Sequence, residues 1–241
     1  MSDFIKAVIE ASQHIIEILS QRKPEHMQAH QIGAGGDISL GADLLSEEIF
    51  AKYLLPIANI DSEESGYLVG KGDDVIILDP LDGSDNYISN IPYYGASVAL
   101  CASSGETKEA IIINFCSQSA YFDTGDGVFF TKIPARTTAP ITPKQSLSKC
   151  GIFEKAYSNP DIAKKLFEHS IKFRSLGASA LSLAYAQESN FMLFGGKIRK
   201  YDAQAGLFLS RHLWINHCED FLLVSRNKQI FDMISKIIKK D

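Results

Sequence analysis

Long apolar runs are missing from this sequence, and their absence excludes one class of protein. No segment of the 241 residues reaches the roughly 18 consecutive apolar residues that a membrane-spanning helix requires. Residues 2–20 carry apolar side chains at helical spacing with charges between them, unlike the unbroken hydrophobic block of a signal peptide. The sequence therefore predicts an amphipathic amino-terminal helix and no membrane partner.

Cysteine is scarce and basic residues are not clustered. The four cysteines are far apart and form no CxxC pair, which is typical of reduced cysteines in a cytoplasmic protein. Lys and Arg total 24 against 29 Asp and Glu, the net charge is -5, and only a few lysines near the carboxyl terminus lie close together. Because a nucleic-acid binder needs a basic stripe, nucleic acid is not expected as the main partner. The remaining composition, 45% hydrophobic, suffices for a sizeable core.

The order of expected elements indicates a layered protein. A second amphipathic helix is expected at residues 43–54, and the glycine-rich stretch before it is expected to be a flexible loop. Further expected strands are 75–78, 96–102, 109–116, 119–123, 127–131 and 221–225, and further expected helices are 159–169, 178–187, 202–214 and 229–239. Strands and helices alternate in both halves, so we expect an α/β (α+β) layered fold. A segment rich in Pro, Thr and Ser at 133–146 is the best boundary, giving regions 1–140 and 141–241.

An acidic turn, LDPLDGSDNY, follows one of the expected buried strands. Asp79 and Asp82 lie three residues apart, with a proline and the carbonyl of Leu81 between them. This is a compact set of hard oxygen ligands, which suits Mg²⁺ better than Zn²⁺. Gly83 and Ser84 are typical of a helix start, whose backbone N–H groups can bind an anion. The motif therefore indicates a phosphate beside a metal ion.

Two other interpretations fit parts of this motif. An isolated DxxDGS motif is most often a solvated acidic turn whose aspartates cap the start of a helix. A calcium loop of the EF-hand type would have glycine at its sixth position, but counting from Asp79 it falls at the fifth, and Asn90 stands where the closing glutamate belongs. The EF-hand is thus excluded, whereas the solvated turn is open on this motif alone.

Five other segments accompany the acidic turn. In chain order the six are GDISLGADLLSEE with Asp37 and Asp43, Glu63-Glu64-Ser65, LDPLDGSDNY, YFDTGDGVFF, RSLGASALSLAYA, and Tyr201-Asp202-Ala203-Gln204-Ala205-Gly206. Their residues and order resemble the inositol monophosphatase superfamily of Mg²⁺-dependent, lithium-sensitive phosphatases, which includes fructose-1,6-bisphosphatases and nucleotide 3'-phosphatases. The last segment departs slightly, with Tyr201 for the usual Trp and Gln204 for the usual Ala. The resemblance covers residues 5–240 and implies an αβαβα sandwich of the sugar-phosphatase type and a homodimer.

The resemblance also implies roles for individual residues. The implied ligands of two or three Mg²⁺ ions are Glu63, Asp79, Asp82, Asp202 and the carbonyl of Leu81. The amides of Gly83 and Ser84 would hold the phosphate. The Ser84 hydroxyl, held by Asp43 and facing Glu63, would orient and deprotonate the attacking water. Such chemistry is sound, because a phosphomonoester dianion repels hydroxide until metal ions neutralise its oxygens.

The sequence departs from the family pattern where the substrate would bind. Family members that prefer inositol carry an acidic residue seven positions before the second-signature aspartate, where this sequence has Gly195. Lys197, Arg199 and Lys200 are candidates for binding a second phosphate, as in archaeal members that also hydrolyse fructose 1,6-bisphosphate, or they form a solvated basic turn. Arg174 is either a substrate contact or a structural ion-pair partner.

Two smaller motifs predict no site. The stretch GAGG lacks the third glycine and the preceding strand of a dinucleotide-binding loop. His26 and His30 have zinc-like spacing, but Met27 replaces the glutamate of HExxH, so both are expected to be solvated loop histidines.

The expected activity is Mg²⁺-dependent hydrolysis of inositol monophosphate or a related sugar phosphate by a metal-activated water. Fructose-1,6-bisphosphatase is the first alternative and nucleotide 3'-phosphatase the next. A non-catalytic regulatory or RNA-processing protein of this fold is an alternative from another class. Against it, a protein kept only for binding has no need of a complete cluster of mutually repelling carboxylates.

Overall fold

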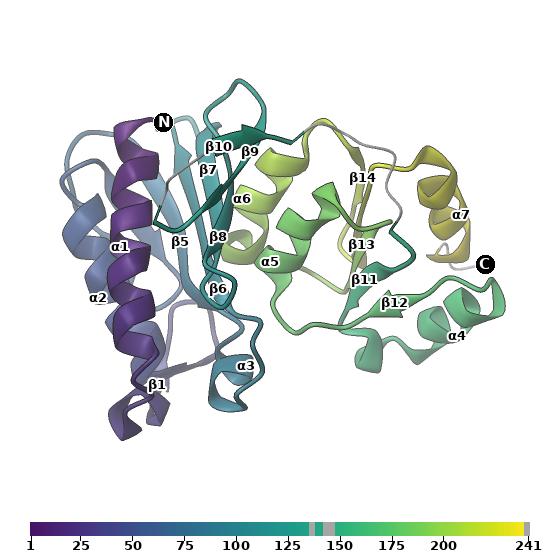
Figure 1. Ribbon diagram of the computed structural model, residues 1–241, viewed down its shortest axis with the longest axis horizontal. Helices are drawn as coiled ribbons and strands as arrows, with labels where there is room; N and C mark the ends of the chain where they lie inside the picture. Colours follow the sequence, from purple (N-terminus) through teal and green to yellow (C-terminus); the bar gives the residue numbers. More distant parts are fainter. Residues whose placement is uncertain (135–137, 142–147, 239–241) are drawn as a thin grey trace.

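Three helix layers and two β-sheets alternate across the computed structural model, which describes residues 1–134, 138–141 and 148–238 (Figure 1). The outer helix layer is α1 (Asp3–Leu19) and α2 (Gly41–Leu54), the middle one is α5 (Ser179–Ala184) and α6 (Lys200–Ser210), and the far one is α4 (Pro160–Glu168) and α7 (Lys228–Ile238). An eight-stranded sheet separates the first two layers and a five-stranded sheet the last two. This is the αβαβα sandwich that the sequence predicts.

The larger sheet has both faces covered by helices. Its strands, in the order β10-β9-β8-β7-β6-β5-β3-β4, are Thr138–Pro140, Val128–Lys132, Ser119–Asp123, Thr107–Asn114, Gly95–Cys101, Val75–Asp82, Asn59–Ser62 and Gly66–Leu68. All neighbours are antiparallel except β3 and β5, which are parallel. Along β7, Ile111 and Ile113 pack in the core with α1 and α2, whereas Ala110 and Ile112 pack with α5 and α6. Burial on both faces explains the nearly continuous apolar runs of these strands.

The smaller sheet forms the second core. Its strands, in the order β12-β11-β13-β15-β14, are Phe173–Arg174, Gly151–Glu154, Met192–Gly195, Phe221–Ser225 and Trp214–His217. Met192 and Phe194 pack with α5 and α6, whereas Leu193 packs with α4 and α7. β11 and β13 are parallel neighbours, so their carboxyl ends reach the same edge of the sheet. The loops that follow these two ends face the middle helix layer.

Two expectations about local structure are wrong. The glycine-rich stretch is not simply a flexible loop, because β1 (Ala29–Ile32) and β2 (Ile38–Leu40) pair as an antiparallel hairpin. Its turn is closed by the Gly33 N–H, which donates to the Asp37 carbonyl at 2.9 Å, and Gly36 adopts a φ of 95°. The helix expected to reach residue 214 ends at Ser210, because Trp214 begins β14 and pairs with β15.

His26 also differs from expectation. It is only 3% exposed, and its Nδ1 lies 3.3 Å from the hydroxyl of buried Tyr87, so it is a packed side chain and not a solvated loop histidine. The four cysteines, all in the described part of the chain, are free thiols as expected. No helix among the described residues has the length and apolar character needed to cross a membrane. Most of the expected boundary at 133–146 lies outside the described residues, so the division at 140 stays a prediction.

Candidate active site

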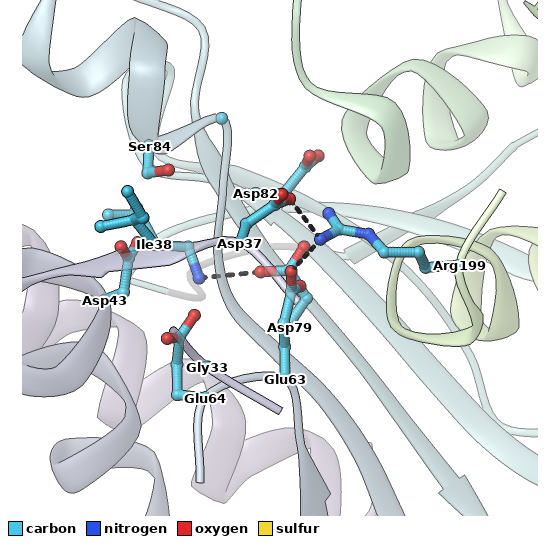
Figure 2. Close-up of a pocket in the computed structure, with 12 residues that line it drawn as sticks. Gly33, Asp37, Ile38, Asp43, Glu63, Glu64, Asp79, Asp82, Ser84 and Arg199 are labelled. Atoms are coloured by element: carbon cyan, nitrogen blue, oxygen red, sulfur yellow. Dashed lines mark hydrogen bonds and ion pairs between the residues drawn. The ribbon is translucent and has the colours of Figure 1, made fainter. Parts of the chain in front are cut away.

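An acidic pocket lies where β5 ends and the short helix α3 (Ser84–Ile88) begins (Figure 2). The residues that line it are Gly33, Asp37, Ile38, Asp43, Glu63, Glu64, Asp79, Leu81, Asp82, Gly83, Ser84 and Arg199. Its volume is about 70 Å³, and it adjoins a second cavity of about 470 Å³ that shares Asp82, Gly83, Ser84 and Arg199 with it. Residues from distant parts of the chain thus meet at one place: Glu63 directly after β3, Asp79 and Asp82 on β5, and Arg199 directly before α6.

Three buried aspartates form the centre of this site. One carboxylate oxygen each of Asp79, Asp82 and Asp202 lies within 4.8 Å of the other two, and each residue is at most 5% exposed. Asp79 and Asp82 come from the end of β5, and Asp202 comes from the first turn of α6. Aspartates about 120 residues apart in the chain, which the family resemblance groups together, thus lie side by side.

Backbone amides hold these aspartates in place. Oδ1 of Asp82 accepts a hydrogen bond from the Ser179 N–H at 2.8 Å, and Oδ2 accepts one from the Leu181 N–H at 2.9 Å. Both donors belong to the first turn of α5, where free N–H groups favour a negative charge. Oδ1 of Asp79 accepts from the Leu81 N–H at 3.0 Å. Asp82 therefore joins the end of β5 to the second half of the chain.

Glu63 is held differently, through Arg199. Nη1 of Arg199 lies 2.5 Å from Oε1 of Glu63 and 2.7 Å from Oδ2 of Asp37 (Figure 2). Its Nε lies 3.0 Å from Oδ2 of Asp202. The guanidinium group is the cation that balances three of the carboxylates. Its ion pairs give Arg199 a role that its grouping with Lys197 and Lys200 did not suggest.

The electrostatics of the pocket favour a bound cation. Burial raises the pKa of Glu63 to about 8, although Arg199 acts in the opposite direction. Burial also raises the pKa values of Asp79 and Asp82 well above their ordinary range, and neighbouring carboxylates raise them further. A nearby positive charge reverses both causes, because it stabilises the ionised forms.

The donor set fits the Mg²⁺ that the family fold implies. Mg²⁺ binds carboxylate and carbonyl oxygens and rarely takes nitrogen or sulfur ligands in proteins. The three aspartates supply only oxygen, and Glu63 and Leu81 line the same pocket. This arrangement could hold a hard divalent cation.

Gly83 and Ser84 lie at the junction of the two cavities. Gly83 has a φ of 89° at the start of α3, and a Cβ there would lie 3.0 Å from both the Ala178 Cβ and the Tyr93 carbonyl oxygen. Only glycine suits such a position, because its φ is left-handed and its surroundings are close. Both residues line the two cavities, at the position where the family resemblance implies phosphate binding.

Asp43 lines the pocket, but its hydrogen bond is local. Its Oδ2 accepts from the Leu40 N–H at 2.6 Å, and burial raises its pKa to about 7 against the lowering effect of that bond. Among the described residues no hydrogen bond joins Asp43 to the Ser84 hydroxyl, so that implied contact stays a prediction.

The candidate substrate-binding residues separate into two groups. Lys197 and Arg199 line the larger cavity. Lys200 pairs instead with Asp61, and Arg174 is exposed and donates to the carbonyl of Phe173 at 2.7 Å; neither residue lines the two cavities of the site. The basic stretch is therefore split, with two of its three members on the cavity.

Two cavity residues were missed by sequence reasoning. Lys155 and Tyr157 line the larger cavity, directly after β11. The Lys155 Nζ lies 5.0 Å from the centre of the Phe194 ring. The available signal was the parallel pairing of β11 with β13, which brings Lys155 to the same edge as Lys197. That signal needed a four-residue strand that the sequence pattern did not reveal.

Gly195 lies at the end of β13, against the side chain of Asn159. A Cβ at Gly195 would lie 2.2 Å from Nδ2 of Asn159, and that same Nδ2 donates to the Lys155 carbonyl at 2.9 Å. The position of the acidic residue in inositol-preferring members is therefore closed here by an amide side chain.

Similarity to known proteins agrees with this geometry. The model of the inositol monophosphatase family matches residues 1–212. The chain is 29% identical to the Nus factor SuhB of Escherichia coli strain K12, over 78% of this chain and 73% of that protein. It is also 29% identical to a Thermococcus kodakarensis protein named fructose-1,6-bisphosphatase/inositol-1-monophosphatase, over 73% of this chain and 67% of that protein.

A solved structure shows the same fold. The extragenic suppressor protein suhB from Bartonella henselae superposes with a TM-score of 0.80 at 19% identity, covering 99% of this chain and 98% of that one. The family match extends over the whole acidic pocket, from Gly33 to Asp202. This chain therefore belongs to the inositol monophosphatase family.

Proposed function

We propose that this protein is an Mg²⁺-dependent phosphomonoesterase that acts on inositol monophosphate or a related sugar phosphate. The observation that carries the proposal is the buried triplet of Asp79, Asp82 and Asp202, whose oxygens lie within 4.8 Å of one another beside a left-handed glycine turn. Carboxylates so close together in a buried site are stable only when they are protonated or lie beside positive charge. A phosphate at the turn and a divalent ion at the triplet would satisfy both features.

The residues of the chain have distinct roles in this proposal. The N–H groups of Gly83 and Ser84 hold the phosphate, and the Ser84 hydroxyl orients the attacking water. Glu63, which lines the same pocket, accepts the proton of that water. Asp43 positions Ser84. When bound, Mg²⁺ supplies the positive charge that neutralises phosphoryl oxygens and makes water a better nucleophile.

Fructose 1,6-bisphosphate is the second candidate substrate, because three cationic side chains line the larger cavity beside its four aspartates. Lys155, Lys197 and Arg199 line it, so a second anionic group on the substrate would find cationic partners there. The named activity of the Thermococcus relative supports the same substrate. Gly195 supplies no acidic side chain for sugar hydroxyls, so both candidate substrates are included in the test.

A regulatory role is the alternative from another class, supported by the name of the SuhB relative as a Nus factor. It predicts no metal-dependent turnover. Homodimer formation and inhibition by millimolar lithium remain predictions that accompany the enzymatic proposal.

The test is phosphate release from inositol 1-phosphate, fructose 1,6-bisphosphate, glucitol 6-phosphate and adenosine 3',5'-bisphosphate, with and without Mg²⁺. Turnover is expected only with Mg²⁺ and is expected to be lost in Asp82→Asn. Asp73→Asn is the matched control, because Asp73 is exposed and lines neither cavity of the site. No metal-dependent turnover on any of the four compounds, or unchanged turnover in Asp82→Asn, would refute the proposal.

A further inference from the structure

Arg199 lies inside the carboxylate cluster and not at its rim. It directly precedes α6, three residues before Asp202, so its side chain folds back over the first turn of its own helix. From there it reaches Glu63 on the opposite half of the site and Asp37 on the hairpin turn. One guanidinium group thus contacts three carboxylates that come from three separate segments.

Two of these three carboxylates belong to the proposed metal ligands. Glu63 is 8% exposed and Asp202 is 4% exposed, so their charges need compensation within the protein. The side chain of Glu63 is also confined, because a Cβ at Gly35 would lie only 2.5 Å from its Cγ. Glycine at position 35 therefore leaves the room that the Glu63 side chain occupies.

The site is asymmetric as a result. Asp79, Asp82 and Asp202 have converging oxygens, whereas the ionic partner of Glu63 is a guanidinium group. An ion at the aspartate triplet shares with Arg199 the carboxylate of Asp202. An ion that takes Glu63 as a ligand must replace the guanidinium group directly.

We propose that Arg199 is a built-in counter-ion that competes with the second divalent cation for Glu63, so that the aspartate triplet is filled first. This inference rests on the proposed Mg²⁺ site. The guanidinium group has somewhere to go, because Arg199 is 38% exposed at its side chain and also lines the larger cavity. Its departure needs rotation of one side chain and no movement of the backbone.

The competition has two measurable consequences. Removing the guanidinium group makes Glu63 available, so the weaker of two classes of metal site should tighten. It also leaves buried carboxylates without their cation, so the metal-free protein should become less stable, and a bound metal should restore that stability. A residue that merely positioned the ligands would have the opposite effect on metal affinity.

The experiment is a titration of the metal-free protein with Mn²⁺, with free Mn²⁺ followed by electron paramagnetic resonance and melting temperature measured in parallel. The wild-type protein is expected to show one tighter and one weaker class of site. In Arg199→Gln we expect the weaker class to tighten by about tenfold or more. The melting temperature should fall without Mn²⁺ and recover at saturation.

Lys200→Gln is the matched control, since it removes the same charge from the neighbouring residue, whose partner is Asp61 outside both cavities. It should leave Mn²⁺ binding unchanged. Arg199→Lys keeps the charge without the forked geometry, so its Mn²⁺ affinity at the weaker class of site should lie between those of the wild-type protein and Arg199→Gln. The same variant replaces Arg199→Gln in the titration if Arg199→Gln does not fold without metal.

Three outcomes overturn the inference. Unchanged binding in both Arg199 variants would show that the guanidinium group does not compete. Weaker binding would show that it holds the ligands in position. In either case the proposed phosphatase function stands, whereas an absence of Mn²⁺ binding in the wild-type protein would overturn this inference and the proposed metal site together.

Discussion

A double-mutant cycle between Gly195 and Asn159 tests whether an amide side chain closes the position that is acidic in inositol-preferring relatives. In Gly195→Ala the new Cβ would lie 2.2 Å from Nδ2 of Asn159, so the amide must rotate away. Rotation breaks the hydrogen bond from Nδ2 to the Lys155 carbonyl. The backbone need not move, because the clash is with the end of a flexible side chain.

The magnitude follows from two opposing effects. Losing the hydrogen bond costs about 0.5–1.5 kcal/mol. Replacing glycine by alanine stabilises by about 0.4–1 kcal/mol where φ is compatible, and Gly195 is not among the glycines with positive φ. Gly195→Ala alone should therefore lower the free energy of unfolding by at most about 1 kcal/mol. In the Asn159→Ala background the clash is gone, and the same substitution should be stabilising.

The cycle should therefore give a coupling energy of about 1 kcal/mol, equal to the hydrogen bond that both single variants lose. Urea unfolding of the four proteins, followed by circular dichroism, measures it. Additivity within about 0.3–0.5 kcal/mol would refute the reasoning, since independent sites behave in that way. If the coupling is found, Gly195→Glu with Asn159→Ala is the variant in which turnover of inositol 1-phosphate should rise relative to that of fructose 1,6-bisphosphate.

Three further predictions concern the pocket and the core. In the metal-free folded protein the pKa of Glu63 is about 8 instead of 4.5, so the stability that this group contributes is present below pH 4.5 and is lost as the pH rises toward 8. The rise in melting temperature on adding Mg²⁺ should therefore be larger at pH 8 than at pH 6. Equal rises at the two pH values would contradict this prediction. Arg211→Gln should lower the free energy of unfolding by about 1–3 kcal/mol, because it leaves the fully buried Asp123 side chain without its cation, 2.6 Å away, and an unchanged urea midpoint would argue against it. Asp43→Asn should lower turnover more than Mn²⁺ affinity, whereas equal losses would make Asp43 a metal ligand.

Much of the site could be predicted because its residues lie in short contiguous patterns. Asp79 and Asp82 follow an apolar strand that both layers of helices bury, and the glycine turn after them begins α3. Asp202 lies in a helix with its own signature. Local sequence determines each of these elements, so the motif and its structure agree.

Long-range pairing explains what could not be predicted. Arg199 and Asp202 are three residues apart on one helix start, a spacing that brings side chains together. The pairing of Arg199 with Glu63 joins residues 136 positions apart, and no periodic pattern in the sequence predicts it. His26 is buried for a similar reason, because its partner Tyr87 is 61 residues away and the sequence around His26 has the appearance of a loop.

Arg199 also changes the argument about catalysis. A complete cluster of repelling carboxylates argues for a metal only if the protein cannot balance those charges itself. Arg199 balances Glu63, Asp37 and part of Asp202, so these residues would be tolerated even in a protein that had lost its metal. Within the part of the chain that the structure describes, Asp79 and Asp82 form no ion pair: their hydrogen-bond donors are neutral backbone amides. Burial and neighbouring carboxylates raise their pKa values, although Arg199 opposes this for Asp79. Two buried carboxylates side by side without an ion pair are therefore the stronger argument for a bound cation.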